Sequence, residues 1–231
     1  MNLEAVRHAC EQVASRVATA ISAQEDVLVL GGDCTVELGT VAGANAAGAR
    51  IGLIYIDFDT DLNAPGTSDG ALDWTGVAHL LELPGCEPSL ASLGPTRPML
   101  APQQVLYFGV ENITPPEAAA IRDHAIQVIS RVEASSDIEA AAAHAAGWAE
   151  RFDCVLVHFD VDVLSFVNFP IAENVRRCDA LRLEQAAITL KRLAALPQWR
   201  GLTVTEVNPD HAPDEAAAFA RLNEVLADAL G

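Results

Sequence analysis

The sequence has few basic side chains and lacks any apolar run of the roughly 18 residues that a membrane-spanning helix needs. Its 14 lysines and arginines stand against 32 aspartates and glutamates, which gives the 231 residues a formal net charge of −18. Nucleic acids and anionic lipid surfaces repel so acidic a chain, and no basic patch offsets the repulsion. We therefore expect neither nucleic acid nor a membrane as a partner, and expect cations or small cationic molecules instead.

Cysteines are also few, and their count of five is odd. Secreted proteins that depend on disulfides usually carry an even number of cysteines at regular spacing behind a secretory leader, and neither feature is recognisable here. We therefore expect free thiols and a cytoplasmic location.

Short apolar, β-branched runs alternate with longer alanine-rich segments of helical period, the pattern of a parallel sheet covered by helices. With 51% hydrophobic residues, the chain can bury a full core as one domain over residues 1–231. An α/β fold with a mainly parallel sheet is expected. The predicted strands are residues 27–30, 51–57, 104–108, 126–129, 154–160 and 202–207. The clearest predicted helices are residues 3–22, 36–46, 135–150, 179–195 and 213–229.

Acidic residues stand at the carboxyl ends of several predicted strands, where a parallel sheet presents its ligand site. Alternate residues of an extended segment face the same side, so the carboxylates of each Asp-x-Asp run converge. A single run is more often a helix cap or a turn, but two runs after apolar strands, beside Gly31-Gly32-Asp33-Cys34, favour a metal site. The acids concerned are Asp57, Asp59, Asp61, Asp160, Asp162 and Glu206.

Carboxylates this close repel one another unless they are protonated, separated by water or neutralised by cations. Oxygen ligands suit manganese, magnesium or calcium, and aspartates shared between two ions are an arrangement that activates water for hydrolysis. The residues themselves thus indicate a type of reaction, metal-assisted hydrolysis, but no substrate.

The order of these motifs resembles that of the ureohydrolase superfamily, to which arginases and agmatinases belong. Members carry Gly-Gly-Asp-His, Asp-Ala-His-x-Asp, Ser-x-Asp-x-Asp and a late glutamate, each at a strand end. The corresponding segments here are residues 31–34, 57–61, 158–162 and 206–209. The resemblance implies a three-layer α/β/α sandwich, a binuclear manganese centre and hydrolysis at a guanidinium carbon that releases urea.

The resemblance also implies roles for individual residues. Glu206 corresponds to the acid that pairs with the substrate guanidinium, and Asn63 to a residue that lines the substrate carboxylate. Asn112 and Glu117 lie in a segment that resembles the one gripping the substrate α-amino group. One metal ion would be held by Cys34, Asp57, Asp61 and Asp160, and the other by Asp57, Asp59, Asp160 and Asp162, with Asp57 and Asp160 bridging.

Three histidines of the family pattern are replaced in this sequence. Cys34 and Asp59 stand at two ligand positions, and Asp73 stands at the position of a catalytic histidine. A thiolate softens one site toward zinc, iron or manganese, whereas a small buried hydrophobic role is the alternative for Cys34. Asp73 either shuttles protons or caps a helix that begins at Trp74.

Two further departures bear on substrate and assembly. Asn112 and Thr114 replace two acids of the α-amino segment, which argues against free arginine as the substrate. The chain begins with a predicted helix where the family has an N-terminal strand. A missing edge strand would leave backbone groups free to pair, so self-association into a homo-oligomer is one expected consequence.

Three functions are compatible with this pattern. The first is a metal-dependent hydrolase of linear C–N bonds, other than peptide bonds, in a small cationic guanidino or amidino compound. The second is a non-catalytic binding or assembly subunit of the arginase fold, suggested by the three lost histidines. The third, a deacetylase-like hydrolase on a related α/β fold, is disfavoured because no paired histidines stand in a glycine-rich loop.

Overall fold

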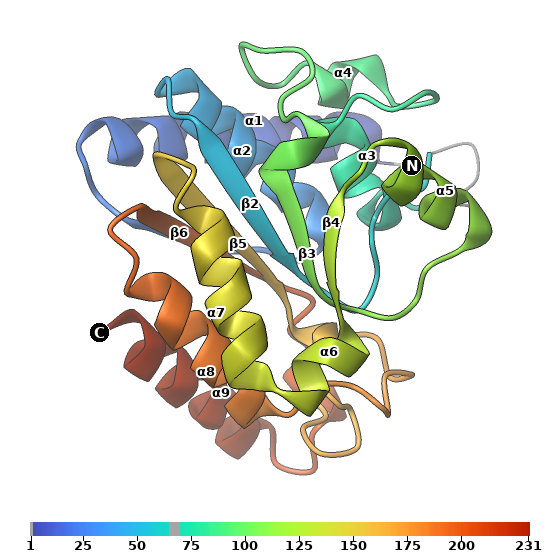
Figure 1. Cartoon of the computed structure of the whole chain (residues 1–231), viewed down its shortest axis with the longest axis vertical. Helices are drawn as coiled ribbons and strands as arrows, with labels where there is room; N and C mark the ends of the chain where they lie inside the picture. The colour runs from blue at the N-terminus through green and yellow to red at the C-terminus, as the bar shows by residue number, and fades with distance from the viewer. Residues whose placement is uncertain (1, 65–69) are drawn as a thin grey trace.

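The computed structural model describes residues 2–64 and 70–231 and shows a six-stranded sheet between two layers of helices (Figure 1). Its strand order is β1-β6-β5-β2-β3-β4, and all neighbours pair in parallel. The predicted three-layer α/β/α fold is confirmed, and each predicted strand is present within a few residues of its bounds. The strands are β1 (Val27–Leu30), β2 (Ile51–Ile56), β3 (Val105–Val110), β4 (Gln127–Ser130), β5 (Cys154–Asp160) and β6 (Trp199–Thr205).

Helices α1 and α2 lie on one face of the sheet, and α7, α8 and α9 lie on the other (Figure 1). None of the helices in the described part of the chain is long and apolar enough to cross a membrane. The helices are α1 (Leu3–Ser22), α2 (Glu37–Ala46), α3 (Gly76–Leu80), α4 (Pro88–Ala91), α5 (Pro115–Asp123), α6 (Arg131–Ser136), α7 (Ile138–Ala149), α8 (Leu183–Ala194) and α9 (Glu215–Leu230).

Each strand of the sheet centre is buried on both faces, which explains its continuous apolar sequence. In β2, Ile54 and Ile56 pack toward α7 and α8, whereas Leu53 and Tyr55 pack toward α1 and α2. Burial of one such aliphatic side chain stabilises the fold by about 1.5–3 kcal/mol. The two cores therefore hold β2 and β5 rigidly, and the residues that follow these strands inherit fixed positions.

The predicted helix at 179–195 begins later than expected, at Leu183. Asp179 lies in the preceding loop, where its carboxylate is 3.3 Å from Arg131 Nη2 and gives no cap. Asp214, by contrast, accepts a hydrogen bond from the Ala217 amide at 3.0 Å and caps α9. The position of an aspartate therefore predicted the cap of α9 correctly, but it placed the start of α8 four residues too early.

Strand β1 forms one edge of the sheet and has β6 as its single strand neighbour within the described ranges. Leu28 and Leu30 on this edge are 50% and 71% exposed, which is unusual for leucines in a strand. A short apolar edge of this kind is open to pairing with another strand.

Candidate metal centre

The strand order brings the predicted site residues together. Because β1, β6, β5 and β2 are successive neighbours and parallel, their carboxyl ends lie at the same edge of the sheet. Cys34 follows β1, Asp57 follows β2, Asp160 ends β5, and Glu206 follows β6. Residues as far apart in sequence as 34 and 206 thus line one cavity of about 70 Å³.

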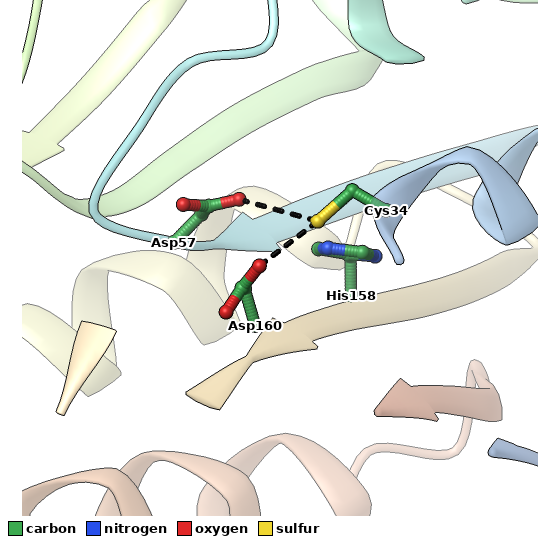
Figure 2. A group of neighbouring side chains, drawn as sticks. All are labelled: Cys34, Asp57, His158 and Asp160. Carbon is green, nitrogen blue, oxygen red and sulfur yellow. Dashed lines mark hydrogen bonds between the residues drawn. The ribbon is translucent and has the colours of Figure 1, made fainter. Parts of the chain in front are cut away.

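Cys34 opens a short 3-10 helix, Cys34–Val36, which Asp33 caps by accepting a hydrogen bond from the Thr35 amide at 2.9 Å. Its Sγ atom donates to Asp160 Oδ2 at 2.9 Å and lies 4.0 Å from Asp57 Oδ2 (Figure 2). The thiol is buried, with carboxylates around it. Its role as a metal ligand and the alternative of a small buried hydrophobic residue both stay predictions.

Four buried side chains form the first ligand group: Cys34, Asp57, His158 and Asp160 each offer a ligand atom, and these atoms all lie within 4.8 Å of one another (Figure 2). One thiol, one imidazole and two carboxylates are donors that zinc, iron and manganese accept. The residues present therefore fit a divalent cation.

His158 is not among the predicted ligands. It lies two residues before Asp160, however, so the two side chains share one face of β5. Its Nδ1 lies 3.3 Å from Glu37 Oε2, its Nε2 lies 3.4 Å from Thr205 Oγ1, and its ring stacks on Tyr55 at a centroid distance of 4.1 Å. With its proton on Nδ1, where buried Glu37 accepts it, the imidazole keeps a lone pair on Nε2. Carboxylates hold metal-binding histidines in this way.

The second ligand group consists of Asp57, Asp59 and Asp162, whose ligand atoms also lie within 4.8 Å of one another. The loop amides fix both Asp-x-Asp runs. Asp57 Oδ1 accepts from the Asp59 amide at 2.7 Å, and Asp160 Oδ1 accepts from the Asp162 amide at 2.7 Å. These turns hold the carboxylates close to one another despite their repulsion.

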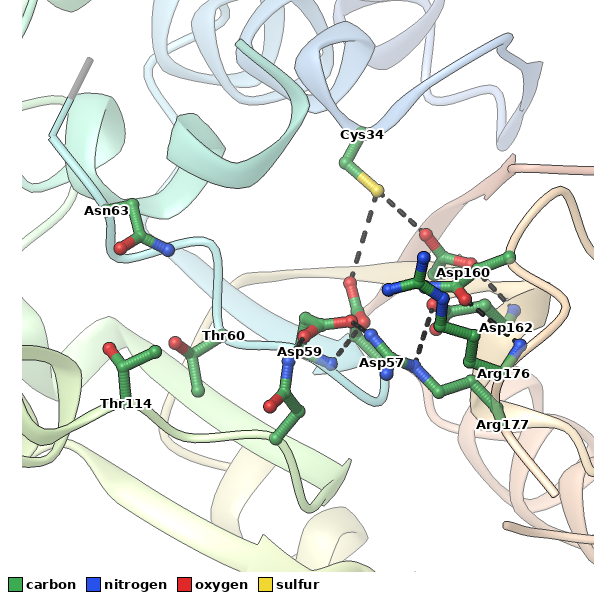
Figure 3. A network of polar contacts seen from close by, with 12 residues as sticks. Cys34, Asp57, Asp59, Thr60, Asn63, Thr114, Asp160, Asp162, Arg176 and Arg177 are labelled. Atoms are coloured by element: carbon green, nitrogen blue, oxygen red, sulfur yellow. Dashed lines mark hydrogen bonds and ion pairs between the residues drawn. The ribbon is translucent and has the colours of Figure 1, made fainter. Parts of the chain in front are cut away.

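A basic side chain lies in this second group. The Arg177 guanidinium donates through Nη2 to Asp59 Oδ2, its Nε is 3.5 Å from Asp162 Oδ2, and its carbon lies 4.6 Å from the centre of the Phe58 ring (Figure 3). Arg177 comes from the loop between β5 and α8, and nothing in its local sequence predicts that it reaches the cluster. The first group thus offers its atoms to an ion, whereas the second already holds a cation of the protein.

Asp61, a predicted metal ligand, lines the same cavity but belongs to neither group among the described residues. Its Oδ2 accepts a hydrogen bond from the buried Tyr55 hydroxyl at 2.5 Å. Asp61 and Glu206 both have a positive φ, of 51° and 61°, which costs a residue other than glycine about 1–2 kcal/mol. Such strain at two residues of one cavity is typical of functional sites. The role of Asp61 as a ligand stays a prediction.

Burial shapes the protonation of the cluster. It raises the pKa values of Asp57, Asp61 and Asp160 well above the usual range for a carboxyl group, and the neighbouring acids add to the effect. Burial, reinforced by Asp59 and opposed by Arg177, raises the pKa of Asp162 to about 6. Burial, and to a smaller extent the charge of Asp160, also raises the pKa of the Cys34 thiol. Cation binding therefore displaces protons from these groups.

The two predicted catalytic residues both line the small cavity. Burial, together with the charges of Asp73 and Asp33, raises the pKa of Glu206 to about 7. Asp73 is the first residue of the 3-10 helix Asp73–Thr75, which Leu72 precedes, and Thr75 precedes α3. The roles of Asp73 as a proton shuttle and as a helix cap both stay predictions.

The predicted substrate-binding residues line a wider pocket of about 610 Å³. This pocket shares Asp59, Asp61, Trp74 and Asn174 with the small cavity, so the two adjoin. The predicted residues on its wall are Asn63, Asn112 and Glu117.

Hydrogen bonds organise this wall. Buried Glu117 accepts from Thr60 Oγ1 at 2.7 Å, from Asn63 Nδ2 at 2.9 Å, and from the amide and hydroxyl of Thr114 at 2.8 and 2.7 Å. Asn112 Nδ2 donates to Asp59 Oδ1. Glu117 thus acts first as the cap of α5 and as the support of Asn63, which is a positioning role.

The sequence matches the profile of the arginase family over residues 1–229. Arginase-1 of Homo sapiens is 27% identical over an alignment of 236 residues, gaps included, which covers 99% of this chain and 72% of that protein. The crystal structure of arginase from Bacillus caldovelox is 26% identical, with a TM-score of 0.90, and the match covers 100% of this chain and 77% of that chain.

The fold extends to a more distant structure. Formimidoylglutamase from Bacillus subtilis is 17% identical with a TM-score of 0.79, over 100% of this chain and 67% of that chain, and this likeness concerns the fold alone. The profile match over nearly the whole sequence, together with the conserved order of strand-end motifs and the shared fold, shows that this chain belongs to the arginase family.

Proposed function

We propose that this protein is a metal-dependent hydrolase that cleaves a linear C–N bond in a small cationic guanidino or amidino compound. One observation carries the proposal: a thiol, an imidazole and two carboxylates, from three strand ends, lie within 4.8 Å of one another in a buried cavity. Membership of the arginase family supports the same class of hydrolase.

The cation would be held by Cys34, Asp57, His158 and Asp160. When bound, a divalent cation lowers the pKa of a water molecule and so makes a nucleophile available near neutral pH. Manganese is the ion that the family resemblance implies, and the sulfur and imidazole donors add zinc and iron as candidates. A second divalent cation would need Asp59 and Asp162, and it would compete there with Arg177.

The acids around the cavity suit a cationic substrate. Glu206, whose pKa burial raises to about 7, would pair with the positively charged amidinium group and orient its carbon. In the reaction, water adds to that carbon, the C–N bond breaks, and the amine leaves with a proton. Asp73 lines the same cavity and would carry the proton. The wider pocket, with Asn63 and Asn112 on its wall, would receive the rest of the substrate.

The test is turnover. The protein is purified without chelator, loaded separately with manganese, zinc or iron, and assayed for urea and ammonia release from a panel of guanidino and amidino compounds. We expect turnover with at least one metal and with a substrate other than free arginine. Absence of turnover with every metal and compound would overturn the proposal.

A binding or assembly subunit is the second candidate, favoured by the contacts of Arg177 with Asp59 and Asp162. Elemental analysis of untreated protein separates the two functions. Bound metal supports the hydrolase, and a folded protein without metal supports the subunit.

We further propose that the protein acts in the cytoplasm and self-associates through the β1 edge. The exposed Leu28 and Leu30 support this second point, since the open edge of an apolar strand is stabilised by a neighbouring strand. Sedimentation velocity measures the oligomeric state directly.

A further inference from the structure

We propose that Arg177 supplies the second positive charge of the acidic cluster, so that the folded chain binds a single divalent cation. The inference rests on the proposed metal centre but does not require that the centre be catalytic.

The contacts of Arg177 fall on two of the three carboxylates that a second ion would need. Its guanidinium engages Asp59 Oδ2 and approaches Asp162 Oδ2, and these two residues belong to the second ligand group alone. Asp57, the third member, is shared with the first group. Two positive charges at the same two carboxylates repel each other strongly, so the guanidinium and an ion exclude one another.

The guanidinium is held from several sides. Its side chain is only 14% exposed, and it lies over the Phe58 ring, a favourable position for a cation. The backbone also fixes it, because Arg177 O accepts a hydrogen bond from the Phe166 amide at 2.7 Å. A buried, stacked and anchored arginine differs from the surface arginines that pair loosely with acids.

Arg177 leaves too few carboxylate oxygens of Asp59 and Asp162 available to hold an ion. Asp162 Oδ1 is buried and has no hydrogen-bond partner within the described residues, so one oxygen of this carboxylate remains available. The other oxygen of Asp59 accepts a hydrogen bond from Asn112, and Asp57 is shared with the first group. Divalent cations such as manganese and magnesium take about six ligands, so Asp162 Oδ1 does not replace the two oxygens beside Arg177. Among the described residues no arginine or lysine forms an ion pair with the first group, which keeps its four donors.

The consequence is a change in the family arrangement. A metal ion at Cys34 and His158 would lie beside the fixed Arg177 guanidinium instead of a second metal ion. The guanidinium has the same sign of charge but does not coordinate a water molecule. The cluster would also remain partly neutralised when metal is absent.

The experiment counts metal ions per chain. Wild-type protein, Arg177→Gln and Arg176→Gln are each saturated with manganese or zinc, freed of loose ions by gel filtration, and measured by inductively coupled plasma mass spectrometry. Arg176 is the exposed neighbour, so its variant loses the same charge without touching the second group in the contacts described. Circular dichroism checks that each variant folds.

We expect one ion per chain in the wild type and in Arg176→Gln, and two in Arg177→Gln. Two ions in the wild type, or one in a folded Arg177→Gln, would overturn the inference. The wild-type count decides the matter even when Arg177→Gln does not fold. One bound ion without turnover leaves this inference standing and counts against the proposed hydrolase, whereas no ion in any protein overturns the metal centre itself.

Discussion

The metal-free protein should lose stability as the pH rises from 5 to 8. Asp162 gives the magnitude, because its pKa is raised from 3.8 to about 6 by burial and by Asp59. A group whose folded-state pKa exceeds its unfolded value contributes stability below the unfolded pKa and loses that contribution as the pH rises through the folded value. The window therefore runs from about pH 4 to about pH 6, and the full difference corresponds to about 3 kcal/mol.

Other groups act in the same direction. Burial also raises the pKa values of Asp57, Asp61 and Asp160, and raises that of Glu206 to about 7, so the loss continues above pH 6. Between pH 5 and pH 8 Asp162 alone contributes about 1.4 kcal/mol. A total stability of about 5–15 kcal/mol is usual for a domain, so a change of this size is measurable.

The assay is urea unfolding followed by circular dichroism in the presence of a chelator. We expect the free energy of unfolding to be lower at pH 8 than at pH 5, and saturating manganese to reduce or reverse the difference. Asp162→Asn should remove about 1.4 kcal/mol of the difference between pH 5 and pH 8, because the pKa of about 6 lies one unit above the lower pH, whereas Asp210→Asn, which removes one charge from an exposed residue, should change it little. Equal or greater stability at pH 8 without metal would refute the reasoning.

Three further predictions concern the site and the sheet edge. Glu37→Gln should weaken metal binding about 10- to 100-fold, because Glu37 orients His158; calorimetry measures this, and unchanged affinity would exclude that role. Glu206→Gln should lower kcat/KM for a cationic substrate about 10- to 100-fold with the metal count unchanged, and equal activity would remove Glu206 from substrate binding. Leu30→Lys should leave a monomer in sedimentation velocity if β1 is the contact, and a persisting oligomer would place the interface elsewhere.

The sheet was predictable because its strands are short apolar runs with acids at their ends. Continuous apolar runs located β2 and β5 nearly to the residue, since burial on both faces leaves His158 as the polar residue inside β5, ahead of Asp160 at its end. The order of the strands in the sheet does not follow from local sequence. The prediction that Cys34 and Asp160 lie close together therefore rested on the order of the motifs and on the family resemblance. The structure then placed these two in contact.

The residues that escaped prediction reach the site through long-range packing. His158 carried a usable signal, because it faces the same way as Asp160 along β5, but its contact with Glu37 on α2 is visible only after folding. Arg177 carried none, since it lies in the loop between β5 and α8 and reaches Asp59 and Asp162 only in the folded chain. Glu117 was recognisable from its position three residues after Thr114 as a helix cap, and the structure adds its support of Asn63.

An anomalous X-ray difference map, recorded from crystals soaked in zinc or manganese, tests the central claim most directly. We expect a peak bonded to Cys34 Sγ and to the side chains of Asp57, His158 and Asp160, with a metal–sulfur distance of about 2.3 Å if the ion is zinc. A cavity that shows only water at saturating metal, with the carboxyl groups turned away from one another, would contradict it.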